Sequence, residues 1–299
     1  MKLVGQTPGS GLRGGAPMID LRNVATSPWE EDLLATAQLG GVVDVWSLAR
    51  AERIATFETL WDGGGWRGAV VPGERPLVVA GAWERHGVCG YDLSGERLWQ
   101  DRSRTNVGAV TALAGGRVAV TYNRRATRVL DAATGEEVRR LRGVERVIPL
   151  TPDRTLGVGG GWCRLLDGSL DALEPRIATG LNLVWFAATD GEHLVVSELG
   201  GPVRIFDSDR RERARLADFL RLVVHEPVTA TWVGLRQADD GQNWMLRFTN
   251  DAEILDRHPV GLLRDVTSMR AGRSLILLTD DGVQVLDCSD RSVRPLVRV

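Results

Sequence analysis

Two glycine-rich runs are the first candidates for chemistry in this sequence of 299 residues. They read WDGGGWRG at 61–68 and GVGGGWCR at 157–164. Such runs cradle phosphate groups when a Lys-Ser/Thr pair follows the glycines and opens a helix. Neither run has a lysine, and no helical periodicity follows either one. Both are therefore predicted to be turns between strands, where glycine is the common residue.

Two acidic tripeptides offer oxygen ligands for a cation. Asp239-Asp240-Gly241 and Asp280-Asp281-Gly282 each place two carboxylates side by side. A calcium ion needs about six or more oxygens, and a calcium-binding loop supplies further acids at alternate positions. These segments lack the further acids, and Asp-Gly is a preferred pair for a two-residue hairpin. We predict hairpin turns and no metal site.

Histidine and cysteine, the side chains most often used for catalysis and metal binding, are scattered along the chain. They are His86, His193, His225 and His258, and Cys89, Cys163 and Cys288. No pair has zinc-ligand spacing, no CxxC pair occurs, and no GxSxG motif marks a nucleophilic serine. The sequence therefore predicts no catalytic residue, no metal site and no cofactor. We expect the cysteines to be buried, free thiols.

The elements that must position any site can be placed because the sequence repeats. Seven short apolar runs end in a polar residue, and these closing residues recur 36 to 45 residues apart. The closing residues are Ser47, Asp92, Asp131, Asp167, Asp207, Thr249 and Asp287. The residue before each of them is apolar in all seven copies. Repeats of this length are typical of solenoids and propellers.

Each repeat contains about four strand-like runs. An apolar run precedes the closing run, a charged run such as GEEVRRL follows it, and a further run such as VGAVTALAG opens the unit. Seven units of four strands predict an all-β fold, a seven-bladed β-propeller of four-stranded antiparallel blades. We expect residues 19–299 to form this single domain after a Gly/Pro-rich arm at 1–18, and Gly40-Gly41 to turn between the second and third strands.

The order of runs and the closing Asp resemble WD40, YVTN and quinoprotein-like propeller repeats. The segment YDLSGERLWQ at 91–100 is especially similar to the strand–turn–strand phrase of those families. No copy contains a Trp-Asp pair, and no Gly-His pair opens a repeat. The resemblance therefore implies degenerate repeats without the usual Asp–His–Ser–Trp network. We expect such a ring to close by contact between the first and last blades, with MKLVG optionally adding to an edge; the sequence leaves this point open.

Aromatic and arginine residues gather near connections that a propeller places on one face. They are Trp61, Trp83, Arg85, His86, Tyr122, Arg124, Arg125 and Trp162, in repeats one to four. Trp, Tyr and Arg are enriched at binding hot spots, so these residues are the candidate binding surface. The alternative is that the arginines are unrelated surface residues and the tryptophans pack between blades.

Composition narrows the class of function. The formal net charge is −2, which gives no general attraction to nucleic acid or anionic membranes. The start of the chain lacks the apolar segment of an export signal, and no run is long enough to span a bilayer, so we expect a cytoplasmic protein. The leading hypothesis is a non-catalytic scaffold or adaptor that binds another protein or peptide. The alternatives are an enzyme or small-molecule binder that uses the central channel or loop face, and an inhibitor or immunity-type binding protein.

Overall fold

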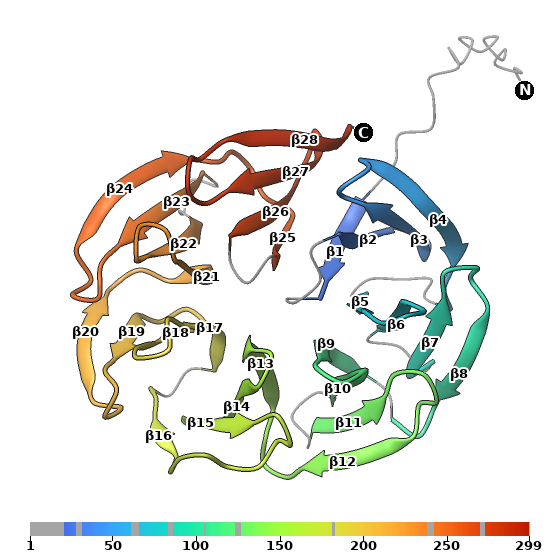
Figure 1. Ribbon diagram of the computed structural model, residues 1–299, viewed down its shortest axis with the longest axis horizontal. Helices are drawn as coiled ribbons and strands as arrows, with labels where there is room; N and C mark the ends of the chain where they lie inside the picture. Colours follow the sequence, from blue (N-terminus) through green and yellow to red (C-terminus); the bar gives the residue numbers. More distant parts are fainter. Residues whose placement is uncertain are drawn as a thin grey trace, which may run out of the picture.

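The computed structural model is a ring of seven four-stranded antiparallel sheets around a central axis (Figure 1). It describes residues 21–27, 32–60, 66–82, 86–104, 106–122, 127–180, 183–237, 242–269 and 273–298. No helix occurs in these ranges. The predicted seven-bladed β-propeller is confirmed. The predicted arm at 1–18 lies outside the described residues.

Every blade is built from four consecutive strands, which follow one another from the channel outwards. Blade one has β1 (Leu21–Thr26), β2 (Leu33–Gln38), β3 (Val42–Ser47) and β4 (Glu52–Glu58); blade two has β5 (Arg67–Val71), β6 (Leu77–Gly81), β7 (Val88–Asp92) and β8 (Arg97–Asp101). Blade three has β9 (Val107–Leu113), β10 (Arg117–Tyr122), β11 (Thr127–Asp131) and β12 (Glu137–Leu141); blade four has β13 (Arg146–Thr151), β14 (Arg154–Gly159), β15 (Trp162–Asp167) and β16 (Ile177–Ala178). Blade five has β17 (Val184–Thr189), β18 (Leu194–Glu198), β19 (Val203–Phe206) and β20 (Glu212–Leu216); blade six has β21 (Leu220–Glu226), β22 (Thr231–Gln237), β23 (Asn243–Phe248) and β24 (Ile254–Pro259). Blade seven has β25 (Asp265–Met269), β26 (Ser274–Thr279), β27 (Gly282–Asp287) and β28 (Val293–Arg298).

The core lies between the blades, not within them. Each of the seven blade interfaces holds its own cluster of buried apolar side chains. The strand β26 shows why the middle strands are apolar on both faces: Leu275 and Leu277 pack toward blade six, whereas Ile276 and Leu278 pack toward blade one. Successive side chains of a strand point to opposite faces, so both sets are buried. A single blade therefore cannot bury its own apolar faces.

The recurring closing residue caps the turn between the third and fourth strands. The Oδ1 atom of Asp92 accepts the backbone N–H groups of Ser94 and Glu96 at 2.9 and 3.0 Å. Asp131, Asp167, Asp207 and Asp287 accept backbone N–H groups in the same way, and Ser47 and Thr249 do so with their hydroxyl oxygens. Short polar side chains stabilise turns by such local hydrogen bonds. The repeat signal is thus a turn-capping signal.

All seven of these turns also contain one residue in the left-handed backbone region. Glycine fills the position in two turns, and other residues fill it in five. The residues are Ala51, Gly95, Gly135, Leu170, Arg210, Ala252 and Arg291, with φ between 51° and 87°. A side chain with a Cβ is strained at such angles, whereas glycine is not. The turn geometry recurs around the ring even where the residue does not favour it.

The ring closes by contact between two complete blades. The strand β1 pairs with β2 inside blade one, and β28 pairs with β27 inside blade seven. The Oδ2 atom of Asp265 accepts the backbone N–H of Val24 at 3.0 Å, and Thr26 Oγ1 donates to the carbonyl of Ser268 at 3.0 Å. A cluster that includes Leu34 and Ile276 packs across the seam. The expected closure by contact between the first and last blades is therefore confirmed, whereas MKLVG lies outside the described residues.

The fourth blade differs from the others at its outer edge. Its last strand, β16, has two residues, whereas the outer strands of the other six blades have five to seven. The part of β15 that β16 leaves uncovered pairs with the connection that precedes β16. Leu166 forms an antiparallel bridge with Ala172, and the Leu173 N–H donates to the Leu165 carbonyl at 3.0 Å. The long connection that replaces a regular strand brings Glu174 and Arg176 to the surface of the blade.

The turn and thiol predictions are confirmed where the structure describes them. Gly40 and Gly41 lie between β2 and β3 with φ of 95° and 87°, and Asp280-Asp281 forms the turn between β26 and β27. Gly160-Gly161 joins β14 to β15. Part of the first glycine-rich run (61–65) and Asp239-Asp240-Gly241 lie outside the described residues. Cys89, Cys163 and Cys288 are free and buried.

Candidate binding surface on the loop face

Two kinds of connection share one side of the ring, which we call the loop face. Because the strands of a blade alternate in direction, the connections from second to third strand and from fourth strand to the next blade emerge on the same side. The Val107 N–H, at the start of blade three, donates to the Ala82 carbonyl at the end of the second strand of blade two, at 3.0 Å. The loop face is therefore where neighbouring blades meet through their connections.

The eight sequence-predicted binding residues divide into two groups. Trp61, Trp83, Arg85, Arg124 and Arg125 lie outside the described residues, so their role stays a prediction. His86, Tyr122 and Trp162 are described, and their surroundings differ from one another.

Tyr122 is a core residue. It is 1% exposed and packs with Val118 and Val120 in the cluster between blades two and three. Burial, followed by the nearby Asp101 charge, raises the pKa of Tyr122 to about 12. The three residues alternate along β10, so they share one face of the strand. In this structure Tyr122 stabilises the blade interface and presents no surface to a partner.

Trp162 is partly exposed and has two guanidinium groups near its ring. The Cζ atom of Arg176 lies 4.2 Å from its ring centroid, and that of Arg164 lies 5.7 Å away. A cation over an indole face is attracted by the ring, by about 0.5–1 kcal/mol at exposed sites. A Cβ at Gly159 would come within 2.3 Å of the indole, so glycine there permits the ring to fold back over the turn. The result is an aromatic side chain with cationic neighbours on the loop face of blade four.

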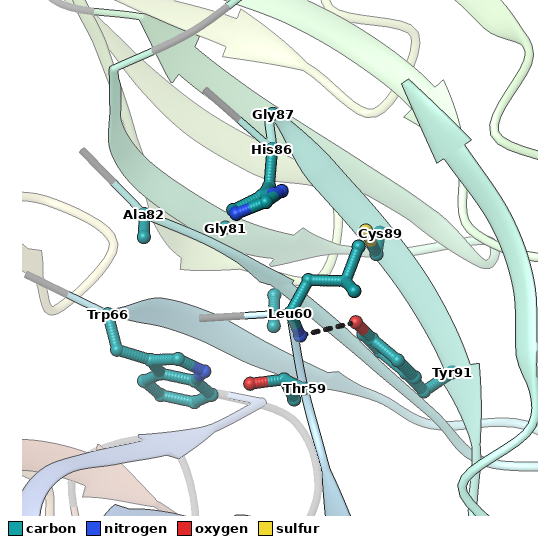
Figure 2. A pocket seen from close by; sticks show the side chains of 10 residues that line it. Thr59, Leu60, Trp66, Gly81, Ala82, His86, Gly87, Cys89 and Tyr91 are labelled. Atoms are coloured by element: carbon teal, nitrogen blue, oxygen red, sulfur yellow. Dashed lines mark hydrogen bonds between the residues drawn. The ribbon is translucent and has the colours of Figure 1, made fainter. Parts of the chain in front are cut away.

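His86 lines a small cavity between blades one and two (Figure 2). Its walls include Trp66, Cys89 and Tyr91, and the Leu60 N–H donates to the Tyr91 hydroxyl oxygen at 3.2 Å. The volume open to solvent is about 20 Å³. That is room for about one water molecule, whereas ligand pockets usually measure about 300–1,000 Å³.

Polar groups of this cavity suit a bound water better than a reacting substrate. Trp66 is 1% exposed, and its Nε1 atom has no hydrogen-bond partner among the described residues. A water molecule would accept that N–H. Burial raises the pKa of the Cys89 thiol, so the thiol stays protonated and weakly nucleophilic at neutral pH.

A larger open groove of about 600 Å³ lies between blades four and five. The connection before β16 forms one wall, and the turn after Phe206 forms the other. An ion pair spans it, with Arg210 Nε and Nη2 at 2.8 and 3.0 Å from the two carboxylate oxygens of Glu174. The two residues of the short strand β16, Ile177 and Ala178, also line this groove.

The sequence missed the arginines that accompany Trp162. Arg164 is two residues further along the same strand, and Arg176 comes from the irregular connection before β16. The alternation of β15 was available as a signal for Arg164, whereas nothing local marked Arg176. Within the described ranges, no group of three or more His, Cys, Asp or Glu side chains has the arrangement of a metal site, and no helix is long and apolar enough to cross a membrane.

Comparisons with known proteins support the architecture alone. No protein-family model matches the sequence, and a search of curated proteins finds no match. A solved structure of U3-55K is similar, with a TM-score of 0.63 and 14% sequence identity over 90% of each chain. In all, 1436 solved chains match structurally. The chain therefore belongs to the class of seven-bladed β-propellers, a fold shared by too many proteins to define one function.

Proposed function

We propose that this propeller is a non-catalytic interaction module, and that it binds another protein or peptide on the loop face of blades one to four. The observation that carries the proposal is the partly exposed indole of Trp162 with the guanidinium groups of Arg164 and Arg176 near its ring. Tryptophan and arginine supply much of the binding energy at protein interfaces because they combine a large contact area with directed polar groups. The degenerate WD40-like repeats agree with a role as a scaffold.

An enzyme that acts on a small molecule is a less well supported function for the loop face. The cavity beside His86 has room for about one water molecule, and burial raises the pKa of all three cysteine thiols. By contrast, a docked protein would cover a larger part of the loop face. That part includes Trp162 at the start of β15, His86, and the connections that carry the sequence-predicted Trp61, Trp83, Arg85, Arg124 and Arg125.

The test begins by identifying the partner through co-purification from native lysate and mass spectrometry, and then measures its affinity. Trp162→Ala is expected to weaken binding by about 30-fold, which corresponds to a hot-spot loss of about 2 kcal/mol. Trp46→Ala is the matched control, because Trp46 also has an arginine near its ring, Arg53 at 6.0 Å, but lies at the other end of its blade.

A second variant extends the test to the residues predicted from sequence. Trp83→Ala combined with Arg124→Ala is expected to weaken partner capture and to leave the melting temperature nearly unchanged. Equal affinities for Trp162→Ala, the double variant and Trp46→Ala would place the interaction elsewhere on the ring and reject the proposal.

A further inference from the structure

Seven residues lie at the starts of the innermost strands, on the loop-face side of the ring, and we call this set the channel mouth. Each is the first or second residue of the innermost strand of its blade. The seven positions are Arg22, Arg67, Gly108, Arg146, Trp185, Arg221 and Asp265. Four of the seven are arginine, although these residues are far apart in the sequence.

The described arginine side chains of the channel mouth each contact the next blade of the ring. Arg67 Nε donates to the Gly108 carbonyl at 3.2 Å, and Arg221 Nη1 donates to the Leu263 carbonyl at 3.2 Å. The Cζ atom of Arg146 lies 4.2 Å from the centroid of the Trp185 ring. Each guanidinium group is thus held in place by a neutral neighbour.

None of these three guanidinium groups has a carboxylate of the described chain within ion-pair distance. Arg67 and Arg221 make hydrogen bonds to backbone carbonyls only, and Arg146 makes its contacts with aromatic rings. Asp265, the acidic member of the channel mouth, already accepts hydrogen bonds from Val24 N–H and the Asn23 amide. The charge of Arg221 also acts on Asp265 and favours its ionised form, whereas the charges of Arg67 and Arg146 have no carboxylate partner among the described residues.

The positive charge of Arg146 is unfavourable in the isolated protein because the group is buried. Burial, with a contribution from the Arg67 charge, lowers the pKa of Arg146 to about 10. The group still carries its proton at neutral pH, so two mutually repelling cations lie near each other at the channel mouth. Burial strengthens the attraction of such a pair of cations for an anion, because the effective dielectric constant is lower than in water.

We propose that the channel mouth is a binding site for an oxyanion, either a phosphate or a carboxylate group, with Arg146 as its principal contact. The planar guanidinium group matches the two oxygens of such an anion, and the Trp185 ring holds it in place. Arg67 and Arg221 add positive charge from two other blades. The anion can be free in solution or carried by an acidic peptide, since both offer the same oxygen atoms.

Isothermal titration of the full chain with sodium pyrophosphate, at constant ionic strength, tests the site. Arg146→Gln and Arg67→Gln are each expected to weaken binding at least about tenfold, as a lost charge-assisted contact does. Arg213→Gln is the matched control: it removes the same charge, but Arg213 is exposed and already paired with Asp251 at 2.8 Å. Its affinity for pyrophosphate should equal that of the native protein.

A second titration, with a blocked tri-glutamate peptide, separates the two sources of the anion. Binding of pyrophosphate alone supports a free phosphate compound, and binding of the peptide that is lost in Arg146→Gln supports a peptide-borne carboxylate. Arg67→Gln provides the same test if Arg146→Gln does not fold. The proposal is overturned if neither probe binds, or if binding in both channel-mouth variants equals that in Arg213→Gln. It is independent of protein capture by Trp162, since either result can occur without the other.

Discussion

Arginines at the outer rim of the propeller and arginines at its channel mouth are used in opposite ways. At the rim, Arg128 lies between Asp101 of the neighbouring blade and Glu137 of its own, and Arg204 pairs with Glu198 at 2.9 Å and with Glu212 at 3.2 Å. At the channel mouth, Arg67 and Arg146 have backbone or aromatic neighbours instead. The arginines at the outer rim form ion pairs within and between blades, whereas Arg67 and Arg146 at the channel mouth form no ion pair with the described residues.

The largest expected effect follows from removing a paired arginine. Arg128→Gln leaves the partly buried carboxylates of Asp101 and Glu137 without their shared cation, and the free energy of unfolding is expected to fall by about 2 kcal/mol. Chemical denaturation measures the change. The exposed Arg213→Gln should cost less than about 1 kcal/mol. Equal losses would contradict the distinction between partly buried and exposed pairs.

The same variant has a pH signature. Burial raises the pKa of Asp101, but hydrogen bonds from Ser103 and the Arg128 charge outweigh it, so that the pKa is lowered overall. A lowered folded-state pKa stabilises the protein above the usual carboxylate pKa, and this contribution is lost as the pH falls through the lowered value. The stability difference between native protein and Arg128→Gln should therefore shrink below about pH 4.

The acidic residue of the channel mouth gives the second prediction. Asp265→Ala leaves the Val24 N–H at the seam without its acceptor, and we expect a loss of about 1–3 kcal/mol in the free energy of unfolding. Asp265→Asn keeps an acceptor oxygen and should cost less. An alanine variant as stable as the asparagine variant would show that this hydrogen bond does not hold the seam.

Asp265 also has the opposite pH signature to the rim carboxylates. Burial raises its pKa above the usual value. A carboxyl group with a raised folded-state pKa stabilises the protein most at low pH, and that contribution is lost as the pH rises through the raised value. Relative to Asp265→Asn, the native protein should lose stability between acidic and neutral pH, as measured by denaturation across that range.

The turns at the rim give a third, smaller effect. Ala252→Gly relieves a left-handed φ of 61° and is expected to stabilise the protein by about 0.5 kcal/mol. Gly135→Ala, in the equivalent turn of blade three, should destabilise it by more than about 1 kcal/mol, because φ is 75° and a Cβ would meet Trp99 at 2.5 Å. Thermal melting of both variants should shift in opposite directions; shifts of the same sign would contradict this account.

The smallest effect on stability is expected at the channel mouth. Arg146→Gln removes the attraction to Trp185 but also a guanidinium group without a carboxylate partner, so the two changes oppose each other. We expect the free energy of unfolding to change by less than about 1 kcal/mol. A loss as large as that of Arg128→Gln would mean that Arg146 is a structural residue.

Much of the fold was predictable because its signals are local. The closing Asp caps its turn through backbone N–H groups two to four residues away, and the apolar run of each middle strand is visible within six residues. Tyr122 shows how strand geometry corrects a prediction. Its spacing of two residues from Val120 and four from Val118 places all three side chains on the face of β10 that packs between blades two and three, although Tyr122 stands next to a connection.

The candidate sites were less predictable because they depend on contacts between distant segments. Arg176 reaches Trp162 only because β16 is short and its preceding connection is irregular. Arg67, Arg146 and Arg221 come from three blades and meet at one side of the ring only in the fold, because the starts of the inner strands share no residue type. The repeat identified the blades but not the register of their first strands.

Closure of the ring without an exchanged strand has a consequence for how the protein folds. Every blade is contiguous in sequence, so its hydrogen-bonded ladder can form as soon as its own four strands are present. Local pairing of this kind keeps the loops that must close short. The final step is then lateral docking of two finished sheets, and the junction of blades one and seven is the place where hydrogen exchange should first report opening of the ring.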